Sequence, residues 1–309
     1  MGFWEVAKNA KKIKGFFDFA KYSIKKFNPD IIIFIDYPGF NLRMMKWSKD
    51  QGFKTAFYIS PQLWAWKENR HKVLKNKADL FFVILPFERD FYRNLDTPCQ
   101  YVGHPLLEII PEKNKETPKV IKNIGLFPGS RRQEIENHLP TLLAFAATHK
   151  EFNFVIAGVS HIPKSFYVET IDSYWPNIDI VYDQPYKVMQ AVDLAISSSG
   201  TATLELALFE VPQIVIYKTS PLTFMIAKRL VKTKFISLVN LIAQKEIVPE
   251  LLQAAFNELA LTEYFNKMKS IVHRRSMIVK YKSIRKDLGN GTASVQIAET
   301  IFNYLNKEV

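Results

Sequence analysis

The sequence has little cysteine and no long apolar run. Cys99 is the single cysteine among 309 residues, which excludes a disulfide framework and any zinc site built on several cysteines. No apolar stretch approaches the roughly 20 residues that a membrane-spanning helix needs. The opening MGFWEVAKNAKKIKGFF is too charged to hold the apolar core of a signal peptide. We therefore expect a protein of a reducing, cytoplasmic compartment.

Motifs for metal-dependent and nucleophilic chemistry are also absent. There is no HExxH pair, and the histidines are scattered along the chain. No two aspartates lie two positions apart, so the DxD motif that binds a metal and a diphosphate is missing. The GxGxxG, GxxxxGK[ST] and GxSxG patterns do not occur either. The sequence thus predicts neither a metal nor a cofactor.

Negative charge is in short supply. The chain has 42 Lys and Arg against 30 Asp and Glu, a net charge of +12. Such an excess indicates a polyanionic partner, or simply a lysine-rich surface. Residues 4–27 form a helix-like segment with basic and apolar faces, which either lies on an anionic membrane or packs inward. The basic face has Lys8, Lys11, Lys12, Lys14, Lys21, Lys25 and Lys26, and the apolar face has Ile13, Phe16, Phe17, Ala20, Ile24 and Phe27.

Short apolar segments alternate with helix-like ones, which predicts an α/β fold of parallel sheets. The expected strands are 31–36, 54–60, 79–85, 123–127, 152–158, 178–183, 193–197 and 213–217. The first, IIIFID, reads as a strand buried on both faces. A polar linker at 111–119 separates two Rossmann-like domains that face a cleft, at 1–115 and 116–285. A C-terminal helix at 286–309 is expected to pack on the first domain or on a partner subunit.

The segment PGSRRQE (128–134) follows one strand and opens a helix. Gly129 would let the backbone approach a ligand, and the N–H groups of a helix start favour an anion. Helix capping by Ser130, with Glu134 in the first turn, is the plainer interpretation. Arg131, however, puts a cation where the helix dipole disfavours one. We therefore favour a phosphate here, held in part by the guanidinium of Arg131.

The segment SSSGTATLE (197–205) repeats this strand–glycine–helix pattern. Ser199, Gly200 and Thr201 offer hydroxyl and backbone donors to a diphosphate, although simple capping would need only one hydroxyl. Glu205 lies one helical turn beyond Thr201, where a carboxylate could accept both hydroxyls of a ribose. Together with 128–134, this loop predicts a nucleoside diphosphate site.

Two further polar residues stand at informative positions. Asp36 ends the strand at 31–36, where it could act as a general base or cap a turn through its side chain, and position alone does not separate these roles. Asn240 interrupts a mostly apolar run, so it must be paired or face the cleft. The preceding stretch 221–234 carries Lys228, Arg229, Lys232 and Lys234, which fits either a solvated basic face or contact with phosphate or membrane.

Taken in order, these segments resemble lipid-A-disaccharide synthases, inverting glycosyltransferases of the two-domain GT-B type. The resemblance rests on MGFWEV (1–6), IDYPGFN (35–41), YISPQLWAW (58–66), ILPFERDFY (84–92), YVGHPLLE (101–108), LFPGSRRQEI (126–135), SSSGTATLE (197–205) and the block 221–253. A single one of these motifs is weak, but the ordered set is specific. Members of this family begin with a strand, a GEASGD loop and a second βα unit ahead of MGFWEV, so we expect an incomplete N-terminal domain.

The resemblance implies a reaction. UDP-2,3-diacylglucosamine donates its sugar to 2,3-diacylglucosamine 1-phosphate (lipid X), giving the β-1,6-linked disaccharide 1-phosphate and UDP without a metal. Asp36 matches the aspartate assigned to deprotonate the acceptor, while Arg131, Glu134, the 199–205 loop and Asn240 match positions tied to donor binding or activity.

The resemblance also implies partners and a location. It places the protein at the cytoplasmic face of the inner membrane, bound to an anionic surface and not to nucleic acid, and it is compatible with a homodimer that exchanges C-terminal helices. Two alternatives stay open. One is another UDP-sugar enzyme of this architecture, such as a UDP-N-acetylglucosamine 2-epimerase. The other is an inactive nucleotide-binding or membrane-surface remnant.

Overall fold

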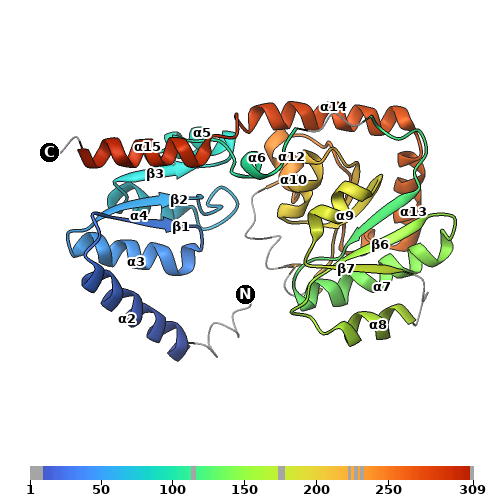
Figure 1. Ribbon diagram of the computed structural model, residues 1–309, viewed down its shortest axis with the longest axis horizontal. Helices are drawn as coiled ribbons and strands as arrows, with labels where there is room; N and C mark the ends of the chain where they lie inside the picture. Colours follow the sequence, from blue (N-terminus) through green and yellow to red (C-terminus); the bar gives the residue numbers. More distant parts are fainter. Residues whose placement is uncertain are drawn as a thin grey trace. The chain divides into compact units, whose positions relative to one another are not determined.

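The computed structural model describes residues 10–112, 116–172, 178–221, 224, 225, 229 and 233–306. The chain forms two compact units (Figure 1). Unit 1 runs to His104 and resumes at Thr292, and unit 2 is Pro105–Gly291. Each unit is built on one parallel sheet, which confirms the predicted α/β class. Within the described ranges, no helix is long and apolar enough to cross a bilayer.

Unit 1 has a four-stranded parallel sheet in the order β1-β2-β3-β4. The strands are β1 (Ile31–Ile35), β2 (Lys54–Tyr58), β3 (Leu80–Val83) and β4 (Gln100–Tyr101). The helices are α2 (Ala10–Phe27), α3 (Pro38–Asp50), η1 (Glu68–Arg70), α4 (His71–Lys77), α5 (Pro86–Asn94) and α15 (Ala293–Asn306). Residues 60–66, between β2 and η1, form a loop.

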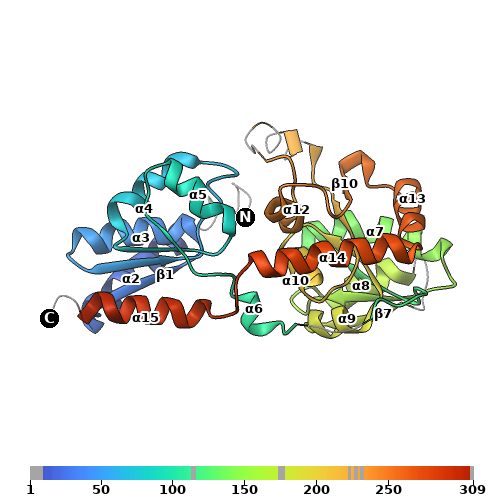
Figure 2. The ribbon, with the colours of Figure 1, turned by 90° about the horizontal axis from the view of Figure 1, so that it is seen from above.

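Helices cover the two faces of the unit 1 sheet, as Figures 1 and 2 show. On one face α15 presents Ala293, Ile297 and Ile301 to Ala56 and Phe82. The opposite face carries the larger core, which is assembled from α2, α3, α4 and α5. Its members include Met44, Met45, Phe57, Leu74, Phe81 and Tyr92, with Phe17, Ala20 and Ile24 of α2 against it. The C-terminal helix thus belongs to the core of unit 1.

Strand β1 differs from its prediction. It lies at the edge of the sheet, and Ile33 and Ile35 are 45% and 55% exposed. Phe34, which points to the other face, is buried. The expectation of burial on both faces is wrong, because an apolar run shows that a strand is apolar but not whether both of its faces are covered.

Unit 2 has a six-stranded parallel sheet in the order β10-β9-β8-β5-β6-β7. Its strands are β5 (Asn123–Phe127), β6 (Asn153–Gly158), β7 (Asp179–Tyr182), β8 (Leu194–Ser198), β9 (Gln213–Tyr217) and β10 (Glu250–Leu252). Its helices are α6 (Leu106–Ile109), α7 (Arg132–Thr148), α8 (Lys164–Asp172), α9 (Pro185–Ala191), α10 (Thr201–Leu208), α12 (Leu238–Ala243), η2 (Gln253–Ala255), α13 (Glu258–Met268) and α14 (Ile271–Asp287). The short strand β10 was not predicted. Residues 222–223, 226–228 and 230–232 of the basic stretch lie outside the described residues.

Candidate nucleotide and acceptor-activating sites

The strand order of unit 2 identifies where a ligand should bind. The chain proceeds from β5 through β6 to β7 on one side, and from β8 through β9 to β10 on the other. Strands β5 and β8 are hydrogen-bonded neighbours with Phe127 opposite Ser197, so the loops that follow them leave the same edge side by side. Ligands of open α/β sheets bind at such a switch point, outside the carboxyl ends of the strands. The two predicted phosphate loops flank this point.

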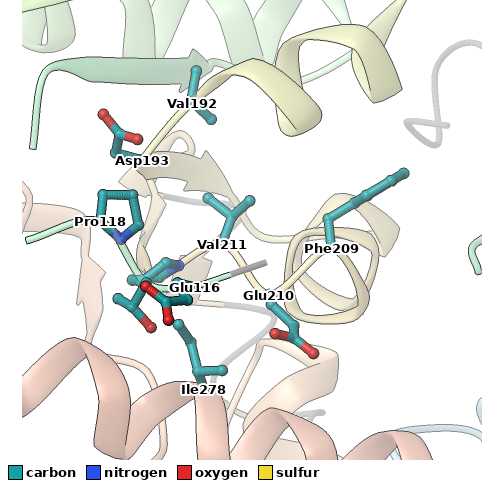
Figure 3. Close-up of a pocket in the computed structure, with 10 residues that line it drawn as sticks. Glu116, Pro118, Val192, Asp193, Phe209, Glu210, Val211 and Ile278 are labelled. Carbon is teal, nitrogen blue, oxygen red and sulfur yellow. The ribbon is translucent and has the colours of Figure 1, made fainter. Parts of the chain in front are cut away.

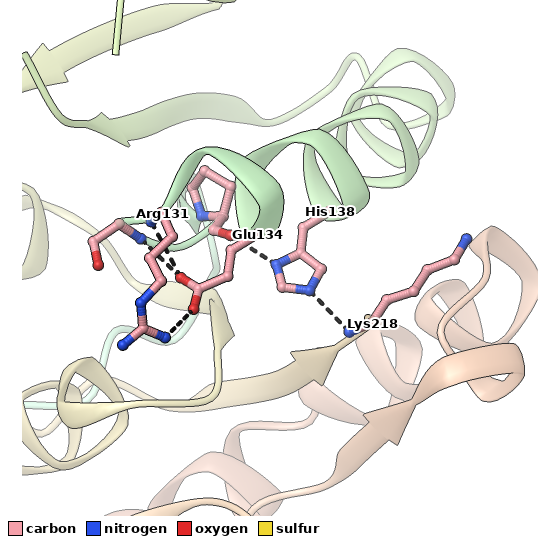
Figure 4. A network of polar contacts seen from close by, with 6 residues as sticks. Arg131, Glu134, His138 and Lys218 are labelled. Carbon is pink, nitrogen blue, oxygen red and sulfur yellow. Dashed lines mark hydrogen bonds and ion pairs between the residues drawn. The ribbon is translucent and has the colours of Figure 1, made fainter. Parts of the chain in front are cut away.

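The loop after β5 is closed by its own carboxylate (Figure 4). Glu134 accepts hydrogen bonds from the backbone N–H groups of Ser130 at 3.1 Å and Arg131 at 3.3 Å, and it pairs with the Arg131 guanidinium at 2.8 Å. Gly129 has φ of +118°, and a Cβ there would lie 2.6 Å from the Glu134 carboxylate. We expected a bound phosphate to offset Arg131, but Glu134 already supplies that negative charge. The Arg131 side chain remains 73% exposed and keeps further N–H groups for a ligand.

His138, on the next turn of α7, ties this loop to the end of β9 (Figure 4). Its Nδ1 lies 2.7 Å from the carbonyl of Pro128, and its Nε2 accepts from the backbone N–H of Lys218 at 2.9 Å. These contacts require the neutral ring with its proton on Nδ1. Burial lowers the pKa of His138, which favours the same neutral state. The loop 128–131, which follows β5, is therefore also connected to the end of β9 through His138.

The loop after β8 is different because the start of its helix is open. No side-chain hydrogen bond caps α10 within the described part of the chain, and its cap residue Gly200 has an extended backbone with φ of 165°. A Cβ at Gly200 would meet no atom within 4 Å. Thr201 is exposed, while Ser199 donates its hydroxyl hydrogen to the carbonyl of Ile236 at 2.9 Å. The free N–H groups and the exposed hydroxyl of Thr201 are what an anion requires.

Glu205 is hydrogen-bonded to Tyr186, a residue that lines a cavity. Tyr186 donates to the Glu205 carboxylate at 2.9 Å, and burial raises the pKa of Glu205. Tyr186 also lines an open cavity of about 510 Å³, together with Asp183, Gln184, Pro185, Lys187 and Gln190. The cavity beside Tyr186 thus lies near Glu205, which we expected to bind a ribose, and nothing in the sequence indicated this cavity.

Asn240 is paired with other groups of unit 2. Its side chain is fully buried and bonds to the backbone of Ile247 and Val248 and to Glu250. Of the two options that its apolar surroundings left open, pairing and facing the cleft, the structure shows pairing.

Asp36 stands in unit 1 at the carboxyl end of β1. Asp36 and Tyr37 both have left-handed backbones, with φ of 48° and 44°, a strain of about 1–3 kcal/mol for each residue. An Asx turn would need the N–H of the residue two positions on, and Pro38 has none. The Asp36 residue is exposed, and no hydrogen bond to its carboxylate is found among the described residues. The carboxylate of Asp36 is therefore accessible to an acceptor molecule.

Glu88 of α5 was not singled out from the sequence. It is buried, and it accepts from the indole N–H of Trp64 at 3.2 Å and the backbone N–H groups of Ile84 and Leu85 at 3.2 and 3.0 Å. Burial raises its pKa to about 7. Glu88 thereby anchors the loop 60–66 at the carboxyl end of β2. A Pro-x-Glu helix start was the available signal for it.

A second cavity lies at the opposite end of the unit 2 sheet (Figure 3). Its lining includes Glu116, Pro118, Asp193, Glu210 and Ile278. Its volume of about 20 Å³ is large enough for one water molecule. Asp193 there binds the backbone N–H groups that begin β5, so this end of the sheet is structural. Across the described ranges, no group of three or more His, Cys, Asp or Glu side chains could hold a metal ion.

Sequence comparison associates the chain with one family. The family model for lipid-A-disaccharide synthetase matches residues 1–296. Lipid-A-disaccharide synthase 1 of Legionella pneumophila (strain Paris) is 37% identical over 287 residues, which cover 88% of this chain and 75% of that protein. The synthase of Trichlorobacter lovleyi is 35% identical over 322 residues, covering 99% of this chain and 84% of that protein.

Structural comparison agrees on the fold. The UDP-N-acetylglucosamine 2-epimerase of Neisseria meningitidis, bound to UDP-N-acetylglucosamine, has a TM-score of 0.64 at 14% identity and covers 98% of this chain and 82% of its own. A spinosyn rhamnosyltransferase complexed with thymidine diphosphate has a TM-score of 0.62 at 13% identity, over 95% of this chain and 79% of its own. These likenesses confirm the GT-B prediction. Because they include both an epimerase and a transferase, the fold alone does not separate these activities.

Proposed function

The chain belongs to the lipid-A-disaccharide synthetase family, and on that premise we propose that it transfers 2,3-diacylglucosamine from its UDP carrier to 2,3-diacylglucosamine 1-phosphate. The products are the β-1,6-linked disaccharide 1-phosphate and UDP. The chain is thus a glycosyltransferase of lipid A biosynthesis by family, and the donor-binding and proton-accepting residues below are proposals.

The open start of α10 is the observation that carries the proposal. Two glycine-containing turns flank the switch point. Among the described residues, a side chain occupies backbone N–H groups at the turn before α7, those of Ser130 and Arg131, and none does so at the turn before α10. We place the diphosphate at α10, where the backbone N–H groups and the Thr201 hydroxyl donate to it. Arg131, exposed on the neighbouring loop, adds a guanidinium contact.

The nucleoside half of the donor is assigned to the cavity beside Tyr186. A ribose between the diphosphate and this cavity could hydrogen-bond to Glu205, whose carboxylate is oriented by the Tyr186 hydroxyl. The cavity volume of about 510 Å³ lies within the range of small-ligand sites, about 300–1,000 Å³.

Asp36 is proposed as the general base. Its carboxylate would accept the proton of the acceptor hydroxyl while that oxygen attacks the anomeric carbon of the donor. The bond from the anomeric carbon to the diphosphate breaks, and UDP leaves with the electron pair. Donors at α10 and Arg131 would stabilise the charge that develops on the leaving diphosphate. Attack opposite to the leaving group inverts the anomeric centre.

Membrane contact by α2 is proposed from its exposed side chains. Phe17, Ala20 and Ile24 pack into the core, whereas Phe16, Phe19, Tyr22 and Phe27 are each more than half exposed, on a helix rich in lysine. Aromatic side chains and lysines together favour an anionic bilayer surface. This would hold the enzyme at the inner face of the inner membrane, where acylated substrates reside. A homodimer remains a proposal from the family resemblance alone.

Vesicle cosedimentation tests the membrane contact. A Phe19→Ser, Phe27→Ser variant should bind vesicles containing anionic lipid more weakly than the unaltered chain, because it loses apolar contact area. Leu259→Ser is the matched control, since Leu259 is 85% exposed but lies in unit 2. Equal binding by all three proteins would reject α2 as the contact.

Turnover with defined substrates tests the activity. We expect UDP release from the diacyl donor in the presence of the acceptor, and no release or epimerisation with unacylated UDP-N-acetylglucosamine. Asp36→Asn should lower kcat by at least a hundredfold while leaving UDP binding intact. Asp30→Asn, an exposed aspartate ahead of β1, is the control. Turnover of only the unacylated sugar nucleotide would favour the epimerase alternative, and UDP binding without any turnover would favour the remnant.

A further inference from the structure

Glu250, the first residue of β10, binds a short segment of chain ahead of α12. Its carboxylate accepts from the backbone N–H groups of Ile236 and Ser237, each at 3.0 Å. It also accepts from the Ser237 hydroxyl at 2.7 Å and from the Asn240 amide at 2.8 Å. Oε1 of Glu250 accepts three of these bonds, and Oε2 accepts the one from Ile236. Segment 236–240 is consequently fixed to the sheet through one side chain.

The same segment holds the loop that precedes α10. Ser199 donates its hydroxyl to the carbonyl of Ile236 at 2.9 Å, while its backbone N–H bonds to the carbonyl of Ile216 at 3.0 Å. Ile236 therefore connects the two groups, because its N–H is bound by Glu250 and its carbonyl by Ser199. Since the Ser199 hydroxyl hydrogen is already used, it is not available to a phosphate.

Asn240 is fully used in the same network. Its oxygen accepts from the N–H groups of Ile247 at 2.7 Å and Val248 at 3.0 Å. Its nitrogen donates to the carbonyl of Val248 at 2.9 Å and to Glu250. A side-chain amide can make four such bonds, so none is left for a ligand.

We propose that Glu250 is a positioning residue for nucleotide binding, acting through Ile236 on Ser199 and hence on the open start of α10. Ser199 and Asn240 serve the site by this route and do not touch the diphosphate. The inference rests on the proposed function, because it concerns the same site. Donors at a helix start bind an anion only when their N–H groups are aimed at it, and loosened support misplaces them.

Glu250→Gln is the first test. The amide has the shape of the carboxylate, but its NH₂ group must face at least one N–H donor, so a bond is lost. We expect Kd for UDP and KM for the donor to rise roughly tenfold or more, with KM for the acceptor unchanged. Glu246→Gln is the matched control, because Glu246 is exposed in the adjacent turn and should behave as the unaltered chain does.

A double-mutant cycle with Ser199→Ala separates positioning from mere folding. Both substitutions act on the fixation of Ile236, so the double variant should bind UDP about as weakly as the worse single variant. If Glu250→Gln does not fold, Ser237→Ala takes its place in the cycle, because it removes one of the four donors and keeps the carboxylate.

The outcomes are distinct. Fold-changes that multiply in the double variant would overturn the inference, as would an unchanged Kd for UDP with a lowered Tm. If the unaltered chain does not bind UDP at all, the proposed function fails instead. Unaltered UDP binding combined with non-multiplying losses in the variants supports Glu250 as the positioning residue.

Discussion

Replacing Gly200 by alanine would test the phosphate site without disturbing the fold. The extended backbone of Gly200 suits any residue, and an added Cβ meets no atom within 4 Å. The free energy of unfolding should therefore change by less than about 1 kcal/mol, because alanine has less freedom in the unfolded chain but is a poorer N-cap residue than glycine. The new methyl group, however, stands at the start of α10, in the space that a phosphate needs to reach the N–H groups.

Gly129→Ala is the matched substitution at the other turn, and its expected effect is the reverse. Its φ of +118° disfavours alanine, and the Cβ would lie 2.6 Å from the Glu134 carboxylate and 2.7 Å from the Glu134 Cβ. The backbone strain costs about 1–2 kcal/mol. Displacing Glu134 from two backbone N–H groups costs about 0.5–1.5 kcal/mol for each bond. The sum is a loss of about 2–5 kcal/mol in the free energy of unfolding.

Urea unfolding and calorimetric titration with UDP measure the two effects separately. Gly200→Ala should unfold as the unaltered chain does and bind UDP at least tenfold more weakly, a change of about 1.4 kcal/mol. Gly129→Ala should unfold at a markedly lower urea concentration. If Gly200→Ala keeps full affinity for UDP, the diphosphate does not bind at α10. If Gly129→Ala is as stable as the unaltered chain, Glu134 does not constrain that loop.

Two pH-dependent predictions follow from buried groups. Because the pKa of Glu88 is raised from 4.5 to about 7, its stabilising contribution is present below pH 4.5 and is lost as pH rises through 7, by up to about 3 kcal/mol. Urea unfolding of Glu88→Gln should lack this loss, and an identical pH profile would contradict it. Because burial lowers the pKa of His138, its contribution is instead lost as pH falls below about 6.5. His138→Phe should cost about 2 kcal/mol or more, since the carbonyl of Pro128 and the N–H of Lys218 lose their partner. A smaller loss at pH 8 would argue against the bridge.

Much of the architecture was predictable from the spacing of apolar residues and from the turn residues that bound each segment. The strands β2, β3, β5, β6, β8 and β9 are apolar runs bounded by turn residues, and such runs have few other uses in a chain of this composition. Strand β10 was not predicted, because it has only three residues, one of them Glu250, and these are too few to show an alternation of apolar and polar side chains. The exposed side chains of β1 escaped because burial depends on neighbours that a local pattern does not contain.

The two turns of the candidate site were predictable in their positions more than in their bonds. A glycine between a strand and a helix marks the turn, so 129 and 200 were found. Each turn is followed by a glutamate five residues after its glycine, Glu134 or Glu205. The sequence does not show that Glu134 binds the backbone N–H groups of its own turn whereas Glu205 binds Tyr186. The roles of His138 and Tyr186 depend on partners some 80 and 19 positions away, and no local pattern shows such pairs.

Glu134 also has a consequence for selectivity. A carboxylate attached to the helix that it caps competes with outside anions as an intramolecular ligand, at an effective concentration that free metabolites do not reach. Inorganic phosphate or another carboxylate would have to displace Glu134 to reach the N–H groups of Ser130 and Arg131. The start of α10 has no such tethered competitor among the described residues. The turn before α7 is therefore expected to exclude small anions, whereas the turn before α10 is open to anions from solution.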